Sequence, residues 1–313
     1  MKPVTGGKNG SRVGALLVLL AVVCLTAVMV MIIMVMGSRR HTAAVPSPPA
    51  TLRIGVLPDQ AREQLQAIHL PLVRYLGDAL GLRAELVIPG TYEDLVERFH
   101  RREIDLAYFG GATFVQAERQ DGALPLVVRV IDRHFTSIVI ARAGLAGRFP
   151  DDFRGRSFLF GAPSSTSGHV MPRHFFEQMG LVPEKYFASV AHLANHDAVI
   201  AAVQAGRADA GVVNGSVLSR RIAEGACDPR RFRQVWESPS YADYVWAVSP
   251  RLSPALRGRL RDAFLALDAD RPEHGRIMAP LGARAYVPAT RADFDLIRAV
   301  VIGASGYSAH ARP

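Results

Sequence analysis

Residues 161–180 read GAPSSTSGHVMPRHFFEQMG and follow the apolar run at residues 157–160, SFLF. Four hydroxyl residues, 164–167, stand together after the Ala-Pro turn, and Gly168 follows them. Beyond this glycine, apolar side chains recur at roughly helical spacing until Gly180, which is a typical helix stop. The stretch therefore predicts a strand, a hydroxyl-rich turn and a helix.

The predicted helix start favours an anion. The first turn of a helix leaves backbone N–H groups without partners and carries a partial positive charge. Serine and threonine hydroxyls add donors there, and Gly168 lets a ligand approach the backbone closely. The competing interpretation is a simple N-cap, which one Ser or Thr satisfies. Four hydroxyl residues beside a glycine exceed that need and favour an anion site.

Several motifs, in order, resemble one protein family. The run Ser165-Thr166-Ser167-Gly168, followed by Met171-Pro172-Arg173, resembles the STSG…PR signature of phosphonate, phosphite and phosphate substrate-binding proteins of ABC transporters. Further segments resemble other family motifs in the same order: residues 104–110 (IDLAYFG), 195–197 (NHD), 206–211 (GRADAG) and 237–239 (ESP). Together they cover about residues 51–300, which makes the combination specific, whereas STSG alone is a weak signal.

Both the pattern and the resemblance imply an α/β protein of two lobes with a hinged ligand cleft, the periplasmic-binding-protein-like fold. Apolar runs at 52–57, 83–88, 105–108, 126–131 and 137–141 predict strands, and residues 64–80 and 92–101 predict helices. Strands that alternate with helices favour mostly parallel sheets. We expect lobe 1 to comprise residues 51–141 and 244–313, with a return strand at 244–248, and lobe 2 to comprise residues 142–243.

The resemblance implies a set of ligand-binding residues. Ser165, Thr166 and Ser167 would hold the anion with hydroxyl and backbone donors. His196 stands at the family's ligand-contacting histidine and Asp243 at an acidic ligand residue. A neutral imidazole can donate to a phosphoryl oxygen, and a carboxylate fits a ligand that carries a proton on oxygen or nitrogen.

Three aromatic residues complete the expected site. Tyr92 takes the place of a ligand-contacting aromatic residue in the first lobe; packing against the core is the alternative role. Tyr108 precedes a second predicted helix start near residues 112–113, where further N–H groups are available, and it equally fits a strand-end core position. Phe135 stands where aminoalkylphosphonate binders carry a tyrosine.

Two departures from the family narrow the expected ligand. Phe135 lacks the tyrosine hydroxyl, and Ser216 replaces the glutamate that recognises an amino group. The loss of that carboxylate makes phosphate, phosphite or a short alkylphosphonate a better fit than an aminoalkylphosphonate.

The N-terminal fifty residues predict a membrane anchor. Residues 13–36 form 24 positions without a charged side chain, and 24 residues of helix span about 36 Å, enough for a ~30 Å hydrocarbon core. We expect residues 1–12 as a cytoplasmic stub, 13–36 as the transmembrane anchor and 37–50 as a linker, with the large domain outside the cytoplasmic (inner) membrane, facing the periplasm or cell exterior. A long cleavable signal peptide is the alternative.

The charge of the chain favours no nucleic-acid partner. Five basic and no acidic side chains lie in residues 1–50, so residues 51–313 carry +4 of the formal +9. No nucleic-acid-binding motif accompanies this modest charge. The expected partners are a small phosphorus oxyanion, an ABC permease and the membrane, and we expect no cofactor and no metal.

Two other functions are weighed against capture for transport. A sensory role, in which the cleft presents its ligand state to a separate kinase, uses the same residues. A hydrolase would need Ser165 or Ser167 with His196 and Asp197 or Asp243 as a triad, but no G-x-S-x-G elbow is present. We therefore expect a binding protein and not an enzyme.

Overall fold

The computed structural model describes residues 25–31 and 49–303 of the 313-residue chain. Residues 25–31 are helical, and the expected stub, most of the 13–36 span and nearly all of the linker lie outside the described residues. Within these two described ranges, no helix is long and apolar enough to cross a membrane. Residues 49–303 belong to one compact unit.

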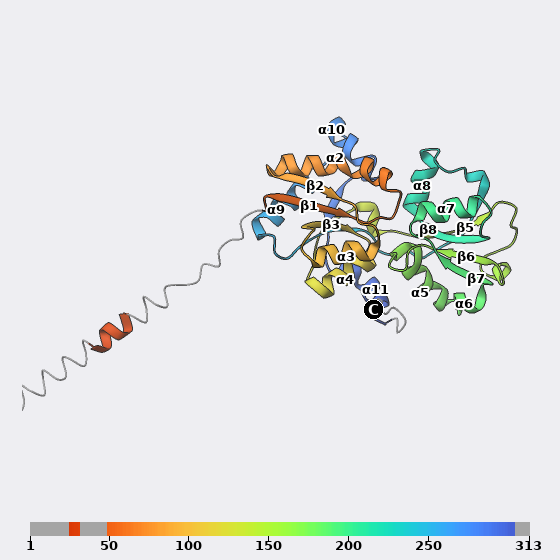
Figure 1. The fold of residues 1–313 in the computed structure, drawn as a ribbon, viewed down its shortest axis with the longest axis horizontal. Coiled ribbons are helices and arrows are strands. Elements are labelled where there is room, and N and C mark those ends of the chain that lie inside the picture. Colours follow the sequence, from red (N-terminus) through yellow and green to blue (C-terminus); the bar gives the residue numbers. More distant parts are fainter. Residues whose placement is uncertain (1–24, 32–48, 304–313) are drawn as a thin grey trace, which may run out of the picture. The chain divides into compact units, whose positions relative to one another are not determined.

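A six-stranded sheet organises one lobe (Figure 1). Its strand order is β11-β4-β10-β3-β1-β2. The strands are β1 (Thr51–Val56), β2 (Arg83–Val87), β3 (Leu106–Phe109), β4 (Leu124–Arg129), β10 (Val245–Val248) and β11 (Tyr286–Pro288). The last two strands return from the far end of the sequence, so the lobe is built from two separate chain segments.

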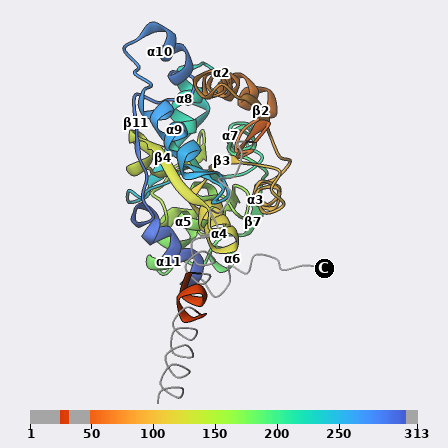
Figure 2. The same ribbon diagram turned by 90° about the vertical axis from the view of Figure 1, so that its left-hand side faces the viewer.

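Helices cover this first sheet. They are α2 (Arg62–Leu80), α3 (Tyr92–His100), α4 (Gly111–Asp121), α9 (Pro254–Leu265), α10 (Pro272–Met278) and α11 (Asp295–Gly303), with short 3₁₀ turns η1 (Val130–Arg133) and η5 (Ala292–Phe294). Helix α2 ends at Gly81, which has φ +64°, a left-handed conformation that glycine adopts without strain. Both views show α11 beside α4 (Figures 1 and 2).

A five-stranded sheet organises the other lobe, in the order β7-β6-β8-β5-β9. Its strands are β5 (Ser137–Arg142), β6 (Ser157–Phe160), β7 (Ser189–His192), β8 (Ala210–Asn214) and β9 (Phe232–Glu237). Its helices are α5 (Met171–Gln178), α6 (Pro183–Tyr186), α7 (His196–Gln204) and α8 (Gly215–Ala223), with the short turns η2 (Asp151–Phe153), η3 (Thr166–Val170) and η4 (Pro229–Arg231). The two-lobed α/β fold is as expected.

Both sheets are mixed, so the expectation of mostly parallel sheets was wrong. β1 runs parallel to β2 and β3, but β10 is antiparallel to β3 and β4. β5 is antiparallel to β8 and β9, whereas β6 is parallel to β7 and β8. Strands that arrive by the crossovers between lobes enter each sheet from the opposite direction, which local sequence patterns do not report.

The lobe boundaries stay a prediction, with one adjustment. The expected boundary after residue 141 divides β5, yet residues 137–142 pair throughout with β8 or β9. We therefore place the first crossover before Ser137.

The two lobes are packed against each other. The apolar core of the six-stranded lobe continues into the other lobe through Val170, Met171 and Phe175 at the start of α5. Hydrogen bonds also join the lobes: the N–H of His196 donates to the carbonyl of Asp59 at 3.1 Å. This closed arrangement brings the residues of the predicted site together.

Candidate anion-binding site

The hydroxyl-rich turn leads into α5 through one π-helical turn, η3. The N–H of Val170 donates to the carbonyl of Ser165, five residues earlier, at 2.9 Å. Pro172 has no N–H and cannot donate to the carbonyl of Gly168. That carbonyl instead accepts the N–H of Gly161 at 2.8 Å, which ties the turn back to the end of β6.

Each of the four hydroxyl residues has a separate position in the site. Ser164 donates to a carboxylate oxygen of Glu93 in the other lobe at 2.6 Å. Ser165 is the N-cap, whose Oγ accepts the N–H of Gly168 at 3.0 Å. Thr166 faces the start of α4, and Ser167 lies near the Tyr241 hydroxyl. A single cap would not require four buried hydroxyls, so the arrangement supports a ligand site.

The start of α4 points at the same turn from the opposite lobe. The N–H of Ala112 donates to Thr166 Oγ1 at 3.0 Å. The N–H of Gly111 donates to Asp243 Oδ1 at 2.8 Å, and the N–H of Tyr244 donates to the same oxygen at 2.8 Å. The expected second set of N–H donors is therefore present, but Thr166 and Asp243 accept from it.

Asp243 is a buried carboxyl group with a raised pKa. Only 1 % of the residue is exposed. Burial raises the pKa from its ordinary value of 3.8 to about 6, although hydrogen bonds from Gly111, Tyr244 and Thr166 favour the charged form. The group is therefore close to its titration point near neutral pH and can take up a proton from a ligand.

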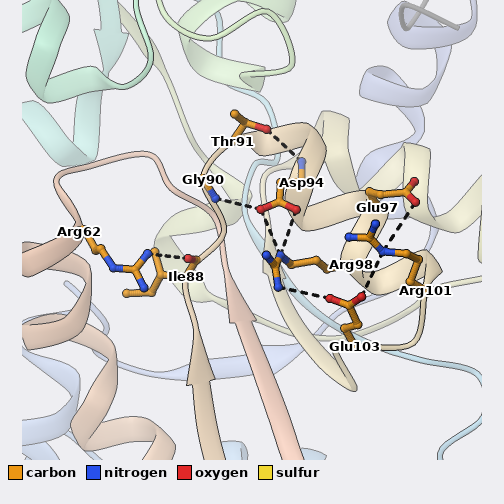
Figure 3. A network of polar contacts seen from close by, with 9 residues as sticks. All are labelled: Arg62, Ile88, Gly90, Thr91, Asp94, Glu97, Arg98, Arg101 and Glu103. Carbon is orange, nitrogen blue, oxygen red and sulfur yellow. Dashed lines mark hydrogen bonds and ion pairs between the residues drawn. The ribbon is translucent and has the colours of Figure 1, made fainter. Parts of the chain in front are cut away.

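A network of polar contacts fixes the start of α3, the helix that begins at Tyr92; Figure 3 shows its members Gly90, Thr91, Asp94 and Arg98. Thr91 Oγ1 accepts the N–H of Asp94, and Asp94 accepts the N–H of Gly90, both at 3.0 Å. Arg98 holds the Asp94 carboxylate from the next turn, at 3.0 Å. These contacts place Tyr92, the first residue of the helix, at the cleft, where 2 % of it is exposed.

His196 is the first residue of α7 and is buried against the turn. Its Nδ1 accepts the N–H of Asn214 at 3.4 Å, so the neutral ring carries its proton on Nε2. Burial lowers the pKa of His196 from 6.5 to about 4. A side-chain carbon placed on Gly168 would lie 3.1 Å from His196 Cε1, so only a glycine lets the turn approach the ring this closely.

Two buried polar atoms at this position lack hydrogen-bond partners. Within the described part of the chain, neither the Tyr92 hydroxyl nor His196 Nε2 makes a hydrogen bond. Burial raises the pKa of Tyr92, and the nearby Ser165 hydroxyl partly opposes this rise. The Tyr92 and Ser165 hydroxyls are nevertheless not oriented to form a hydrogen bond. Buried donors without partners are rare and costly. Both lie beside the helix start, where the first N–H groups have no intrahelical acceptor. The arrangement suits an oxyanion.

The remaining predicted residues, Tyr108 and Phe135, belong to a buried aromatic cluster around Tyr244. Tyr108 stacks on Tyr244, with ring centroids 4.9 Å apart. Phe135 meets the edge of Tyr244 at 5.7 Å, and its backbone pairs with Tyr241. Phe135 is buried. A ligand contact of Tyr108 or Phe135 stays a prediction.

Sequence reasoning missed Asp59, which lies buried just after β1. Its carboxylate accepts hydrogen bonds from the Tyr244 hydroxyl and the Gln60 amide. One sequence signal was available, because polar residues that directly follow a parallel strand tend to face ligand sites. Asp59 lines a small cavity between the lobes, together with Ser216 and Arg220.

Two α/β lobes closed over buried hydrogen-bond donors are the architecture of periplasmic-type substrate-binding proteins. A family model described as ABC transporter, phosphonate, periplasmic substrate-binding protein matches residues 54–294. The chain therefore belongs to this family, as the motifs indicated.

Two curated relatives cover most of the chain. The probable ABC transporter phosphite binding protein PhnD1 of Prochlorococcus marinus (strain MIT 9301) is 26 % identical over 266 residues, which is 81 % of this chain and 90 % of the relative. The phosphate-import protein PhnD of Mycolicibacterium smegmatis is 27 % identical over 274 residues, 80 % of this chain and 85 % of the relative.

Solved structures share the fold. The structure of Prochlorococcus marinus PhnD1 in complex with methylphosphonate has a TM-score of 0.76 and 26 % identity and covers 82 % of this chain and 98 % of its own. A binding protein component of an ABC phosphonate transporter from Pseudomonas aeruginosa has a TM-score of 0.75 at 18 % identity, and the match covers 82 % of this chain and 87 % of the Pseudomonas chain. The second likeness supports the fold alone.

Proposed function

We propose that this protein captures a small phosphorus oxyanion outside the cytoplasmic membrane and delivers it to an ABC importer. The observation that carries the proposal is the pair of unpartnered buried donors, Tyr92 and His196, beside the helix start at Thr166. The relatives named above are described as binding phosphite, importing phosphate and, in one structure, holding methylphosphonate. Phosphate, phosphite and short alkylphosphonates are therefore the proposed ligands.

The proposed site distinguishes oxyanions by their protons. The N–H groups of Thr166 and Ser167, the Tyr92 hydroxyl and His196 Nε2 donate to unprotonated oxygens. Asp243 accepts a proton from a ligand oxygen, because a buried carboxylate beside an anion is costly without a proton between them. Sulfate has no proton at neutral pH, so it binds more weakly than a singly protonated phosphorus oxyanion.

Binding is better supported than hydrolysis by the orientation of His196. Its Nδ1 accepts a backbone N–H, so Nε2 keeps its proton and cannot take one from a serine hydroxyl. Asp243 is engaged with the start of α4, and the Asp197 carboxylate pairs with Arg221 and accepts the N–H of Ala61, so neither carboxylate orients the ring. The triad of a serine hydrolase is therefore not assembled among these described residues.

The membrane anchor at residues 13–36 is part of this proposal and is supported by the sequence alone. Its 24 uncharged positions lie between basic flanks. An anchored binding protein stays near its permease, which raises the local ligand concentration at the transporter.

A ligand screen tests the proposal. Thermal shift measurements, followed by calorimetry, compare phosphate, phosphite, methylphosphonate, aminoethylphosphonate and sulfate with non-oxyanion controls. Stabilisation by at least one of the first three, and a weaker response to sulfate, is expected. Stabilisation by sulfate alone, or by none of the oxyanions, would contradict the proposal.

A further inference from the structure

A cavity of about 20 Å³ lies beside the proposed anion site. The charged groups that line it are Asp59 and Arg129 from one lobe and Arg220 from the other, and Arg129 is already paired with the carboxylate of Asp132. Neutral polar residues complete the walls: His69 and Tyr244 from the first lobe, and Asn214 and Ser216 from the second. Two of the lining residues connect the cavity with the anion site. The N–H of Asn214 donates to His196 Nδ1, and Tyr244 directly follows Asp243 in the sequence. About 10–15 Å³ holds one water molecule, so in the closed protein the cavity admits one small polar group.

A carboxylate and a guanidinium group face each other at this cavity from opposite lobes. Burial raises the pKa of Asp59, and the positive charge of Arg220 acts against that rise. Arg220 also crosses the cleft by donating from Nη2 to Gln60 Oε1, while Gln60 Nε2 donates to Asp59 Oδ1. The positive charge of Arg220 therefore favours the ionised form of this buried carboxyl group, whereas Arg129 is paired with Asp132.

The position of Arg220 on α8 is suited to this role. It lies four residues after Ser216, so both side chains share one face of the helix. Only 15 % of the Arg220 side chain is exposed. Its Nε lies 3.7 Å from Glu224 without the geometry of a hydrogen bond, and within the described residues it has no other partner. Because the Ser216 side chain is small, the Arg220 side chain forms the larger part of the cavity wall on this helix face.

We infer that Arg220 determines ligand specificity by occupying the place that a cationic substituent of the ligand would take beside Asp59. This inference rests on the proposed binding of phosphorus oxyanions. A ligand ammonium group would meet the guanidinium charge in a site of low dielectric, where like charges repel strongly. An aminoethyl chain would also need more room than one water molecule occupies. The wild-type protein therefore selects compact phosphorus oxyanions without an amino group.

Replacing Arg220 by alanine reverses this selection. Arg220→Ala opens a space beside Asp59 and leaves a buried carboxylate that favours a cation. Aminoethylphosphonate supplies one, whereas propylphosphonate has the same shape without the charge. The ratio of the two association constants separates the effect of charge from the effect of space.

Calorimetry with the full-length protein in detergent micelles measures that ratio. Arg220→Ala is expected to raise the preference for aminoethylphosphonate over propylphosphonate by about tenfold or more, as removal of a like charge predicts. Arg220→Lys keeps the charge and should leave the ratio at its wild-type value. Arg230→Ala is the matched control, because the Arg230 side chain lies in the same lobe and is 88 % exposed.

The outcomes separate this inference from the proposed function. Wild-type protein that binds methylphosphonate, with Arg220→Ala leaving the ratio within about threefold of wild type, would overturn the role of Arg220 alone. Tighter wild-type binding of aminoethylphosphonate than of methylphosphonate would do the same. If Arg220→Ala fails to fold, Arg220→Gln replaces it, because glutamine removes the charge and keeps an amide near Gln60. The ratio of the association constants for aminoethylphosphonate and propylphosphonate then tests the role of Arg220 in the same way. Absence of binding to phosphate, phosphite and methylphosphonate would overturn the proposed function itself.

Discussion

Replacing Asp243 by asparagine is expected to stabilise the ligand-free protein at neutral pH. The carboxyl group is buried, and its Oδ1 accepts the N–H groups of Gly111 and Tyr244 at 2.8 Å each. An asparagine Oδ1 can accept both hydrogen bonds, so Asp243→Asn removes the charge and keeps these contacts.

The magnitude follows from the pKa of Asp243. Burial raises this pKa from 3.8 to about 6, so the folded protein binds a proton more tightly than the unfolded chain. The difference between the two values corresponds to about 3 kcal/mol of unfolding free energy. That cost is absent at low pH, where the group is neutral in both states. It grows as the pH rises from about 4 and is complete above about pH 6, where the folded protein also loses the proton.

Unfolding by urea between pH 4.5 and pH 8 measures this effect. Asp243→Asn should exceed the wild type by about 1–3 kcal/mol at pH 8, and the gain should shrink toward pH 4.5. Asp209→Asn is a control of opposite sign. Hydrogen bonds from Ser157 and Arg142 outweigh burial and lower the pKa of Asp209, so its charged form stabilises the fold above the unfolded pKa. A wild type as stable as Asp243→Asn at pH 8, with parallel pH profiles, would refute the reasoning.

Three further predictions test the site and the anchor. Tyr92→Phe should weaken binding of the preferred oxyanion by about 1.5–3 kcal/mol, the range for hydrogen bonds to charged groups, because it removes the unpartnered hydroxyl that donates to the ligand; unchanged affinity by calorimetry would remove this donor from the site. Gly168→Ala should destabilise the protein by about 1–3 kcal/mol, because a side-chain carbon there would lie 2.8 Å from Ser165 Oγ and 3.1 Å from the Gly161 Cα. Gly258→Ala in α9 meets no atom within 4 Å and should stabilise it by about 0.5–1 kcal/mol; equal effects of the two changes on thermal unfolding would contradict this. The full-length protein should stay in carbonate-washed membranes, and a soluble mature form beginning near Ala44 would show that residues 13–36 are cleaved.

Much of the fold could be predicted from local pattern. The apolar run at 52–57, the helix at 64–80 with Gly81 after it and the return strand at 244–248 all appear within a few residues of their expected places. Each has a signal in neighbouring residues, such as period-two or helical spacing and a glycine stop. Strand direction has no such signal, because it depends on how the chain crosses between lobes.

The candidate site was predicted in part, for a similar reason. The hydroxyl cluster, His196 and Asp243 belong to recognisable motifs, and the closed structure brings them together with Tyr92. Pro172 has no N–H to donate to the Gly168 carbonyl, so this carbonyl is free to accept the N–H of Gly161. Asp59 and Arg220 are 161 positions apart in the sequence and meet only across the cleft, so no local pattern connects them.

A crystal structure of the protein grown with methylphosphonate tests the proposed anion site most directly. The phosphonate oxygens should lie about 2.7–3.2 Å from the N–H groups of Thr166 and Ser167 and from His196 Nε2, within hydrogen-bond range. The Tyr92 hydroxyl should donate to the same group, and Asp243 should face a protonated oxygen. A phosphonate bound elsewhere, with His196 Nε2 still unpartnered, would contradict the proposed site.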